Sequence, residues 1–565
     1  MPPSTQPSYT SRRSPVFARR GMTASSQPLA SQVGLSVLME GGNAADAAVA
    51  MAAMLNLTEP CSTGIGGDCF ALYYDAKTKS ITALNGSGRA PAALSLERLE
   101  KDNLIDRQTW LISDPYHAHC VTVPGACAGW CDLLARHGSM PLTEVLMPAI
   151  YYAEQGFPVA PITSHFWSVG AAKQLATATN GVELTIDGRG PQPGETFRNP
   201  GLARTFRMVA EGGKDAFYKG EIGRTLVQTL RSAGSLLTEQ DLSEHRSTWD
   251  TPIGTTYRKH RIWECPPNGH GIAALIALNI LEGFDLASQD RNSAARWHLL
   301  IEAMRLAFAD TSWHVADPKF APAPLGGLLD KSYAAERRKL IDPSRATADI
   351  RRGTPPGRSG TVYFCTVDCQ GNACSMINSN YMGFGTGIVP KGFGFTLQNR
   401  GYCFSTNPEH PNRVEPRKRP YHTIIPGMIT REDGSLYSPF GVMGGEMQPQ
   451  GHMQVAVALF DDQLDPQAAL DRPRFCINSI TQTGTVSLED GIPPQVVEEL
   501  KRMGHPIGLP KSVLEELKRT GEPIPDVLSG QRRSLFGRGQ VIHRREDGVL
   551  CAGSDARADG CAMGF

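Results

Sequence analysis

The residues with the clearest chemical potential are Thr361 and its immediate surroundings. Residues 343–360, PSRATADIRRGTPPGRSG, have the proline, glycine and arginine content of a linker, which ends just before Thr361. Cleavage of the Gly360–Thr361 bond would give a threonine with both a nucleophile and a base, because an α-amine with a pKa of about 7.7 to 8.0 accepts a proton near neutral pH. This pattern predicts attack on amides by an N-terminal threonine, without a histidine or an aspartate.

Thr361 also begins a predicted β-hairpin. TVYFCTVD and NACSMINS are typical strands, and the loop CQG between them ends in the glycine that three-residue loops prefer. If Asp368 pairs with Asn372, Thr361 lies opposite Ser379. Facing hydroxyls are also an ordinary cross-strand pair, and threonine is common in strands. The hairpin alone therefore leaves a structural and a catalytic role open.

A glycine turn further along the chain is suited to the oxyanion that forms when an amide is attacked. Residues 441–452, GVMGGEMQPQGH, place Gly444 and Gly445 after a predicted strand. Backbone N–H groups in such a turn can donate hydrogen bonds to an oxyanion. We interpret the pair as an oxyanion element, with a simple turn as the alternative.

Alanine-rich helices and alternating strands must position these residues. Residues 42–54, GNAADAAVAMAAM, predict a closely packed internal helix capped by Asn43. Residues 296–310, RWHLLIEAMRLAFAD, predict a core helix with its charges on the other side. The glycine-rich stretches 63–70 and 383–389 lack the sequence context of nucleotide-binding loops. The mixture indicates layered α/β structure.

Composition and charge exclude several classes of function. The 565 residues are 41% hydrophobic and 20% charged, with 56 basic and 56 acidic side chains. A net charge of zero provides no basic footprint for nucleic acid. No apolar run reaches the roughly 18 residues of a membrane span. The polar start of the chain lacks the apolar core of a secretory signal, so we predict a cytoplasmic protein with a disordered leader over residues 1–13; an organelle-targeting sequence is the alternative.

The thirteen cysteines include no C-x-x-C pair. Metal binding by Cys365 with Cys369, or by Cys127 with Cys131, would need further ligands that the sequence does not provide. Buried free thiols in a reducing compartment account for them better. We predict neither a metal nor an organic cofactor.

Several motifs together resemble the γ-glutamyltransferase (γ-glutamyltranspeptidase, glutathione hydrolase) family of N-terminal nucleophile hydrolases. The resemblance extends from about Ser14 to the end of the chain. The motifs that carry it are EGGNAADAAVA, TGIGGDCF, LLIEAMRLAFAD, DCQGNACS, GFGTGIV, RKRPYHTIIPGMI, MGGEMQPQGH and GSDARADG.

This resemblance implies an α/β fold, a four-layer αββα sandwich made as one inactive precursor that cuts itself between Gly360 and Thr361. The large chain would then comprise residues 14–360 after the leader, and the small chain residues 361–565. The two fragments would form one intertwined heterodimer, with a higher oligomer left open.

The family's roles can be carried over to matching positions. Thr361 resembles the nucleophile that takes an acyl group from a γ-glutamyl amide and passes it to water or to an amine. Ser379 stands where the family has a supporting threonine hydroxyl. Gly444 and Gly445 resemble the oxyanion element. The expected partner is a small-molecule γ-glutamyl or related acyl amide.

The substrate pocket departs from the family pattern at two motifs. The family's usual arginine is Ser87 in this chain, with Arg89 two positions later. His422 and Thr423 stand in place of paired serines after Arg-Pro. We nevertheless predict that Arg89, His422 and Thr423 contribute to substrate binding.

Three further positions concern the glutamate α-amine. Arg400 and Cys403 replace a glutamine and an aspartate that contact it, and Tyr381 replaces an asparagine. Loss of the acid should weaken the binding of an ammonium group. Arg89 or Arg400 can still hold a carboxylate, and a surface or structural role for each stays open.

Three functions therefore remain open. The first is a γ-glutamyl hydrolase or transferase that acts on glutathione-like compounds. The second is a cephalosporin or glutaryl-type acylase, whose acyl group has a terminal carboxylate and no α-amine. The third is an unprocessed, non-catalytic relative.

Overall fold

The computed structural model describes residues 13–347, 360–478 and 484–565. The leader predicted for residues 1–13 therefore lies outside the described residues, apart from Arg13, and so does most of the predicted linker.

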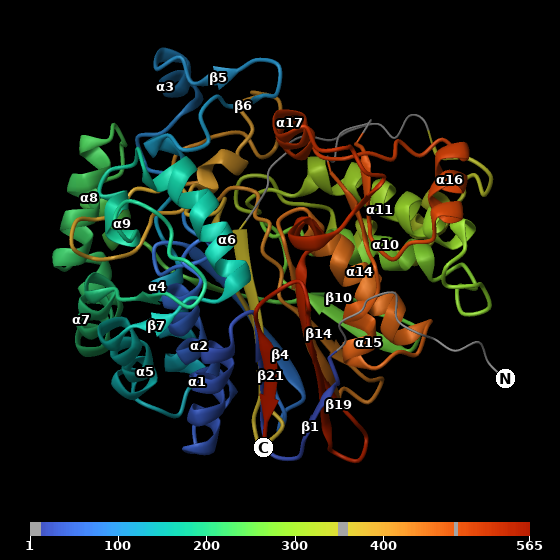
Figure 1. Ribbon diagram of the computed structural model, residues 1–565, viewed down its shortest axis with the longest axis horizontal. Coiled ribbons are helices and arrows are strands. Elements are labelled where there is room, and N and C mark those ends of the chain that lie inside the picture. Colours follow the sequence, from blue (N-terminus) through green and yellow to red (C-terminus); the bar gives the residue numbers. More distant parts are fainter. Residues whose placement is uncertain (1–12, 348–359, 479–483) are drawn as a thin grey trace.

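Two seven-stranded antiparallel sheets face each other at the centre of the molecule, with helices on both outer sides (Figure 1). The first sheet, in the order β1-β20-β19-β15-β14-β11-β10, contains β1 (Val16–Ala18), β10 (Ile253–Tyr257), β11 (His260–Glu264), β14 (Gly427–Thr430), β15 (Leu436–Met443), β19 (Arg538–Arg544) and β20 (Leu550–Ser554). The second, in the order β21-β2-β12-β13-β3-β4-β9, contains β2 (Met22–Ser25), β3 (Asp68–Asp75), β4 (Ser80–Gly86), β9 (Thr248–Asp250), β12 (Gly360–Val367), β13 (Ala373–Tyr381) and β21 (Cys561–Gly564). This arrangement confirms the predicted four-layer αββα sandwich.

The outer layers consist of two groups of helices, on the left and right in Figure 1. Those beside the second sheet are α1 (Pro28–Met39), α2 (Ala44–Thr58), α4 (Ala126–His137), α5 (Leu142–Gln155), α7 (Pro200–Tyr218) and α8 (Glu221–Ser232). Those beside the first are α10 (Ile272–Leu281), α11 (Ala294–His314), α14 (Met447–Phe460), α15 (Pro466–Asp471) and α16 (Pro494–Arg502). Smaller elements connect them: α3 (Leu96–Lys101), α6 (Pro161–Gly170), α9 (Glu239–Ser243), α12 (Leu325–Leu328), α13 (Lys331–Arg338), α17 (Lys511–Thr520), β5 (Ile105–Asp106), β6 (Leu111–Ile112), β7 (Phe157–Pro158), β8 (Thr196–Phe197), β16 (Phe475–Ile477), β17 (Val486–Glu489) and β18 (Val527–Leu528).

The β12–β13 hairpin is buried on both faces. Successive side chains of a strand point to opposite faces, so Val362 and Phe364 pack into the helical layer, whereas Tyr363 and Cys365 pack into the apolar layer between the sheets. The predicted register is confirmed from Val362 opposite Asn378 to Val367 opposite Ala373. Gly371 in the loop has a φ of +84°, the left-handed conformation for which glycine is favoured.

Helix α2 supports this hairpin from the outside. All its residues are buried, and it packs against both β12 and β13. The Asn43 side chain accepts hydrogen bonds from the N–H groups of Ala45 and Asp46, and the Asp46 carboxylate accepts one from the Asn43 N–H. The predicted cap is thus confirmed and forms a full capping box.

The charges of α11 do not face solvent, contrary to the predicted pattern. Arg296 is 2% exposed and pairs with Asp462 at 2.6 Å, and Glu302 is fully buried. Other segments cover the polar side of this helix, and Asp462 supplies the charge partner of Arg296 there. A pattern of charge along one helix cannot reveal partners that come from distant parts of the chain.

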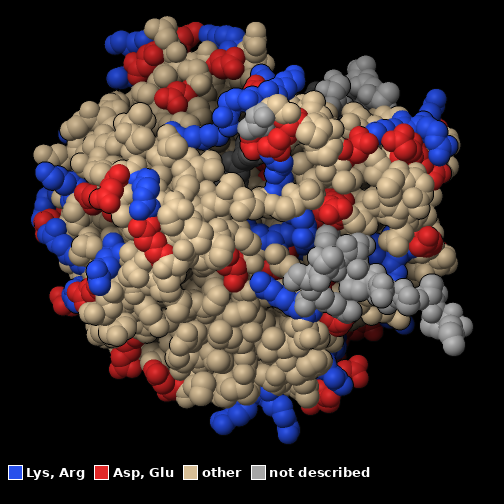
Figure 2. All heavy atoms as spheres, viewed as in Figure 1, with Lys and Arg blue, Asp and Glu red and all other residues tan. Residues whose placement is uncertain are grey.

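Acidic and basic side chains are interspersed on the face shown in Figure 2. All thirteen cysteines are free thiols, and most are buried, as predicted. Within the described ranges, no helix combines the length and apolar character needed to cross a bilayer.

The close approach of the two sheets can be tested at Gly441 of β15. A Cβ atom there would lie 2.5 Å from the ring of Tyr363 in β12. We expect Gly441→Ala to lower the free energy of unfolding by roughly 1 to 3 kcal/mol, because overpacking displaces neighbouring groups. Denaturant unfolding of Gly326→Ala provides the control, since a Cβ at Gly326 meets no atom within 4 Å. Equal stability of the two variants would contradict this packing.

Candidate active site

The hairpin brings the hydroxyls of Thr361 and Ser379 together. Their Oγ atoms lie 3.0 Å apart, and both residues are fully buried. Ser379 Oγ also accepts hydrogen bonds from the Tyr381 N–H at 2.8 Å and from Nη2 of Arg400 at 3.2 Å. Because a hydroxyl oxygen has two lone pairs, these two donors favour the Ser379 hydroxyl as the donor toward Thr361.

A register shift ends the hairpin beside these hydroxyls. Between Val362 and Gly360 the pairing of the two strands shifts by one residue, so that Gly360 pairs with Tyr381. Tyr381 has a φ of +78°, which is unusual for a bulky residue. Such irregularities at strand ends commonly redirect side chains near functional sites. Here the Tyr381 ring lies 4.4 Å from Cζ of Arg400.

Arg400 is a fully buried guanidinium held mainly by neutral groups. Its Nη1 donates to Thr423 Oγ1 at 2.8 Å and lies 3.8 Å from the Cys403 sulfur. Its Nε has no hydrogen-bond partner, and no carboxylate in the described ranges forms an ion pair with it. A buried cation without a paired anion is costly, so this site is suited to a carboxylate of a ligand.

A buried pair adjoins this group. Asp68, the first residue of β3, lies opposite Ser379 in the sheet, and its Oδ2 is 3.1 Å from His422 Nε2. Burial raises the pKa of Asp68 to about 6, although Arg400 and two backbone N–H groups oppose the rise. Burial and the charge of Arg400 hold the pKa of His422 well below its usual range. His422 is therefore neutral and is engaged with Asp68.

Sequence reasoning did not single out Asp68. The available signal was its position at the end of a glycine-rich turn and the start of a strand. Its proximity to Ser379 depends on the pairing of β3 with β13, which are far apart in the sequence.

Arg89 is not in hydrogen-bond contact with these residues. Its Nη1 bonds the Arg246 carbonyl at 3.5 Å, and its side chain is partly exposed. Ser87 Oγ accepts a hydrogen bond from Asn268 at 3.0 Å. The structure therefore groups Tyr381, Arg400 and Thr423 around Ser379, and leaves Arg89 outside their hydrogen-bond network.

Gly444 and Gly445 form a turn between β15 and α14. Their φ values are +137° and +59°, so the left-handed conformation accounts for both glycines. No acceptor in the described part of the chain takes a hydrogen bond from either N–H group. These two donors are thus available to a ligand.

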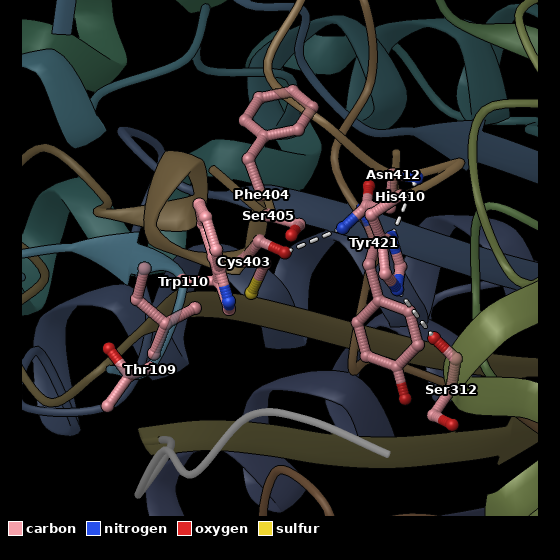
Figure 3. A pocket seen from close by; sticks show the side chains of 10 residues that line it. Thr109, Trp110, Ser312, Cys403, Phe404, Ser405, His410, Asn412 and Tyr421 are labelled. Carbon is pink, nitrogen blue, oxygen red and sulfur yellow. Dashed lines mark hydrogen bonds between the residues drawn. The ribbon is translucent and has the colours of Figure 1, made fainter. Parts of the chain in front are cut away.

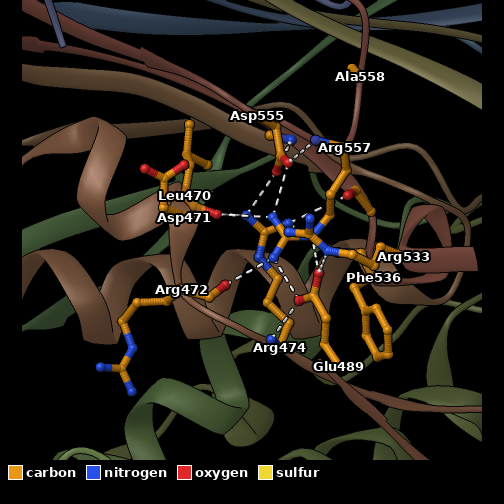
Figure 4. Close-up of polar contacts among 12 residues, drawn as sticks. Leu470, Asp471, Arg472, Arg474, Glu489, Arg533, Phe536, Asp555, Arg557 and Ala558 are labelled. Carbon is orange, nitrogen blue, oxygen red and sulfur yellow. Dashed lines mark hydrogen bonds and ion pairs between the residues drawn. The ribbon is translucent and has the colours of Figure 1, made fainter. Parts of the chain in front are cut away.

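A buried charge network, drawn in Figure 4, holds the segment around Phe536, which continues into Gly537 beside this turn. Arg474 donates to the Phe536 carbonyl and to Asp555, both at 2.9 Å. Arg557 pairs with Asp555 at 2.9 Å and with Glu489 at 2.6 Å. The neighbouring Gly537 backs the turn, because a Cβ on Gly444 would lie 3.2 Å from its Cα. The network thereby fixes the backbone on which the turn rests.

A pocket adjoins the Arg400 group through Cys403 (Figure 3). Its cavity volume is about 20 Å³. Its lining comprises Thr109, Trp110, Leu111, Ser312, Cys403, Phe404, Ser405, His410, Asn412 and Tyr421. Sequence reasoning identified only Cys403 of this set, because the others meet through loops far apart in the chain.

One group of side chains has the composition of a metal site in the described residues: His298, Glu302 and His505, all buried. Both His298 ring nitrogens already have partners at 2.8 Å, namely His505 Nε2 and the Asp342 carbonyl. Arg305 lies 4.0 Å from Glu302 and places a positive charge beside the cluster. A hydrogen-bonded core cluster explains these residues without an ion.

Both the sequence and the fold are similar to those of known proteins. The Gamma-glutamyltranspeptidase family profile matches residues 30–565. The glutathione hydrolase-like YwrD proenzyme of Bacillus subtilis is 34% identical over 554 residues, 97% of this chain and 99% of the relative. The Acylase ACY 1 proenzyme of Pseudomonas sp. strain SE83 is 34% identical over 503 residues, 88% of this chain and 89% of the relative.

A solved structure is similar over the whole molecule. The crystal structure of cephalosporin acylase from Bacillus halodurans matches with a TM-score of 0.88 and 40% identity, and the match covers 100% of this chain and 99% of that chain.

Two facing antiparallel sheets between helical layers define the fold of the N-terminal nucleophile hydrolases. Within that class, the profile match over nearly the whole chain decides the family. The chain belongs to the gamma-glutamyltranspeptidase family of enzymes.

The raised pKa of Asp68 has a consequence for stability. A carboxyl whose pKa rises from about 4 when unfolded to about 6 when folded favours folding below pH 4, and this contribution is lost as the pH rises through 6. The melting temperature of wild type relative to Asp68→Asn should therefore fall between pH 4 and 7, by the equivalent of roughly 1 to 3 kcal/mol.

Asp215→Asn serves as the control, because the Asp215 side chain is 65% exposed. Its melting temperature should track that of wild type across the same range. A constant difference between wild type and Asp68→Asn would show that Asp68 does not titrate there.

Proposed function

We propose that the protein is a self-processing N-terminal threonine amidohydrolase or acyltransferase that cleaves γ-glutamyl amides. The observation that carries this proposal is the 3.0 Å contact between the hydroxyls of Thr361 and Ser379, beside the guanidinium of Arg400. It joins a nucleophile, a supporting hydroxyl and a carboxylate-binding cation in one buried group.

Processing would begin with Thr361. Its Oγ attacks the carbonyl carbon of Gly360, the bond from that carbon to the Thr361 nitrogen breaks, and an ester replaces the amide. Water then hydrolyses the ester, leaving a carboxylate on Gly360 and a free α-amine on Thr361. Gly360 has no side chain to obstruct the attack.

The processed threonine would then act on substrate. Its α-amine accepts the proton from Oγ while Oγ attacks the substrate amide carbon. The oxyanion accepts hydrogen bonds from the N–H groups of Gly444 and Gly445. The leaving amine takes up the proton, and water or an acceptor amine resolves the ester.

The topology supports a heterodimer of residues 14–360 and 361–565. Strands β12 and β13 of the small chain lie between β2 and β3 of the large chain. In the other sheet, β14, β15, β19 and β20 lie between β1 and β11, which belong to the large chain. Each sheet would therefore contain strands from both fragments.

An acylase function is the second candidate. The similarity to a structure named cephalosporin acylase favours an acyl amide without an α-amine, and so does Cys403 in place of the family's acidic residue. Arg400 would bind the terminal carboxylate in either case. An unprocessed relative is the third reading, and the processing experiment separates it from both enzymes.

Purified wild type should consist of two fragments, whereas Thr361→Ala should remain one chain of 61.1 kDa. Intact-mass spectrometry after expression and prolonged incubation measures this. Thr366→Ala provides a matched control, because Thr366 is a buried threonine of the same strand whose hydroxyl bonds the Ala44 carbonyl. Wild type that stays uncleaved would rule out the proposed mechanism.

Arg400→Met should reduce kcat/KM for acyl anilides with a terminal carboxylate by roughly 100-fold, since a charge pair inside a buried site is lost. The measurement compares γ-glutamyl and glutaryl anilides after the extent of self-cleavage has been established. Arg89→Met should change the same constants less than threefold or so, because Arg89 lies outside the hydrogen-bond network. The reverse order of effects would place the carboxylate site at Arg89.

A further inference from the structure

Glu446 is a largely buried acid immediately after the Gly444–Gly445 turn. Its side chain is 14% exposed. Oε2 accepts a long hydrogen bond, 3.4 Å, from the Tyr421 hydroxyl, and lies 3.5 Å from His270 Nδ1. Across the described residues, no lysine or arginine forms an ion pair with this carboxylate.

His270 is not a close partner for the charge of Glu446. Hydrogen bonds between charged groups of this kind usually span 2.7–2.9 Å, well below the observed 3.5 Å. His270 Nδ1 is instead 2.8 Å from the Tyr421 hydroxyl. A carboxylate with so little exposure and no close cation is suited to a positively charged group of a ligand.

Arg400, in turn, is a cation that lacks a paired anion among the described residues. It is a buried cation whose direct hydrogen bonds go to the neutral side chains of Ser379, Thr423 and Cys403. Besides the Asp68–His422 pair, the site thus contains an acid, Glu446, and a cation, Arg400, and neither forms a close ion pair within the described part of the chain.

These two charges border the same pocket. Arg400 Nη1 lies 3.8 Å from the sulfur of Cys403, which lines the pocket, and the hydroxyl of Tyr421, which also lines it, donates to Glu446. Burial raises the pKa of Tyr381 and of Cys403, Glu446 adds to the rise, and Arg400 opposes it. Both charges therefore lie beside the same group of side chains.

We propose that Glu446 binds the ammonium group of the acyl donor while Arg400 binds its carboxylate. This inference rests on the proposed function and determines its substrate class: acyl groups that carry both charges, as the γ-glutamyl group does, are preferred over acyl groups with a carboxylate alone. The acid that sequence reasoning found missing at Cys403 is thus supplied from the glycine turn.

The test uses two donors that differ only in the α-ammonium group, γ-glutamyl-p-nitroanilide and glutaryl-p-nitroanilide. For Glu446→Gln, the ratio of kcat/KM for the γ-glutamyl donor to that for the glutaryl donor should fall roughly 30-fold or more, mainly through KM. Glu446→Asp, which keeps the charge, should retain most of the wild-type ratio. Glu336→Gln is the control, because this glutamate is 68% exposed on α13.

A ratio unchanged in Glu446→Gln would overturn the proposal. Calorimetry with L-glutamate and glutarate as ligands provides an independent measurement on the same purified proteins. Wild type should bind L-glutamate more tightly, and Glu446→Gln should lose this preference. If wild type binds glutarate as tightly as L-glutamate, Glu446 has no such role, even if the enzyme is active. If wild type neither cleaves itself nor hydrolyses either anilide but prefers L-glutamate, the proposed function fails and the assignment of Glu446 stands.

Discussion

The pairing of β12 with β13 is the constraint on which the site depends. A slip of one residue would turn every side chain of a strand to the opposite face. Both faces of this hairpin are buried, with Phe364 against the helices and Tyr363 between the sheets, so a slip would disrupt two apolar layers at once. The 3.0 Å contact between Thr361 and Ser379 is therefore fixed by packing along the whole hairpin.

The buried arginines differ in whether they form an ion pair. Arg474 and Arg557 are buried, and each pairs with a carboxylate within 2.9 Å. Arg400 is buried as deeply, yet its hydrogen bonds reach two hydroxyls and a thiol. Desolvation is costly for all three, but only the first two recover that cost within the protein. The contrast supports the proposed carboxylate site, since a ligand anion would give the Arg400 guanidinium the charge partner that the described part of the fold does not supply.

Local features of the site could be predicted from the sequence. The length of the CQG loop and its glycine fix the hairpin register, and Asn43 marks the start of α2. Ser379 follows from that register without knowledge of any other strand. These features depend on interactions between residues close together in the chain, for which sequence patterns are informative.

The remaining features depend on contacts between distant segments. Asp68 joins the site only because β3 pairs with β13, about 300 residues away. The charge pattern of α11 indicates a side that faces away from the core, but it cannot show that Arg296 on that side is buried and paired with Asp462. Arg89 and Arg400 are equivalent as sequence candidates, and only the fold separates the buried guanidinium from the partly exposed one.

The topology also explains how the proposed cleavage at the centre of the molecule could leave the fold intact. The proposed cleavage follows Gly360, where β12 begins, so the new chain start would remain within a sheet. After the cut, β12 stays paired with β13 from Val362 to Val367 and with β2 from Cys365 to Val367. The register shift lies between Gly360 and Val362, so Thr361 occupies the irregular end of the ladder. A bond at this position can be broken while the register that places the Thr361 hydroxyl beside Ser379 persists.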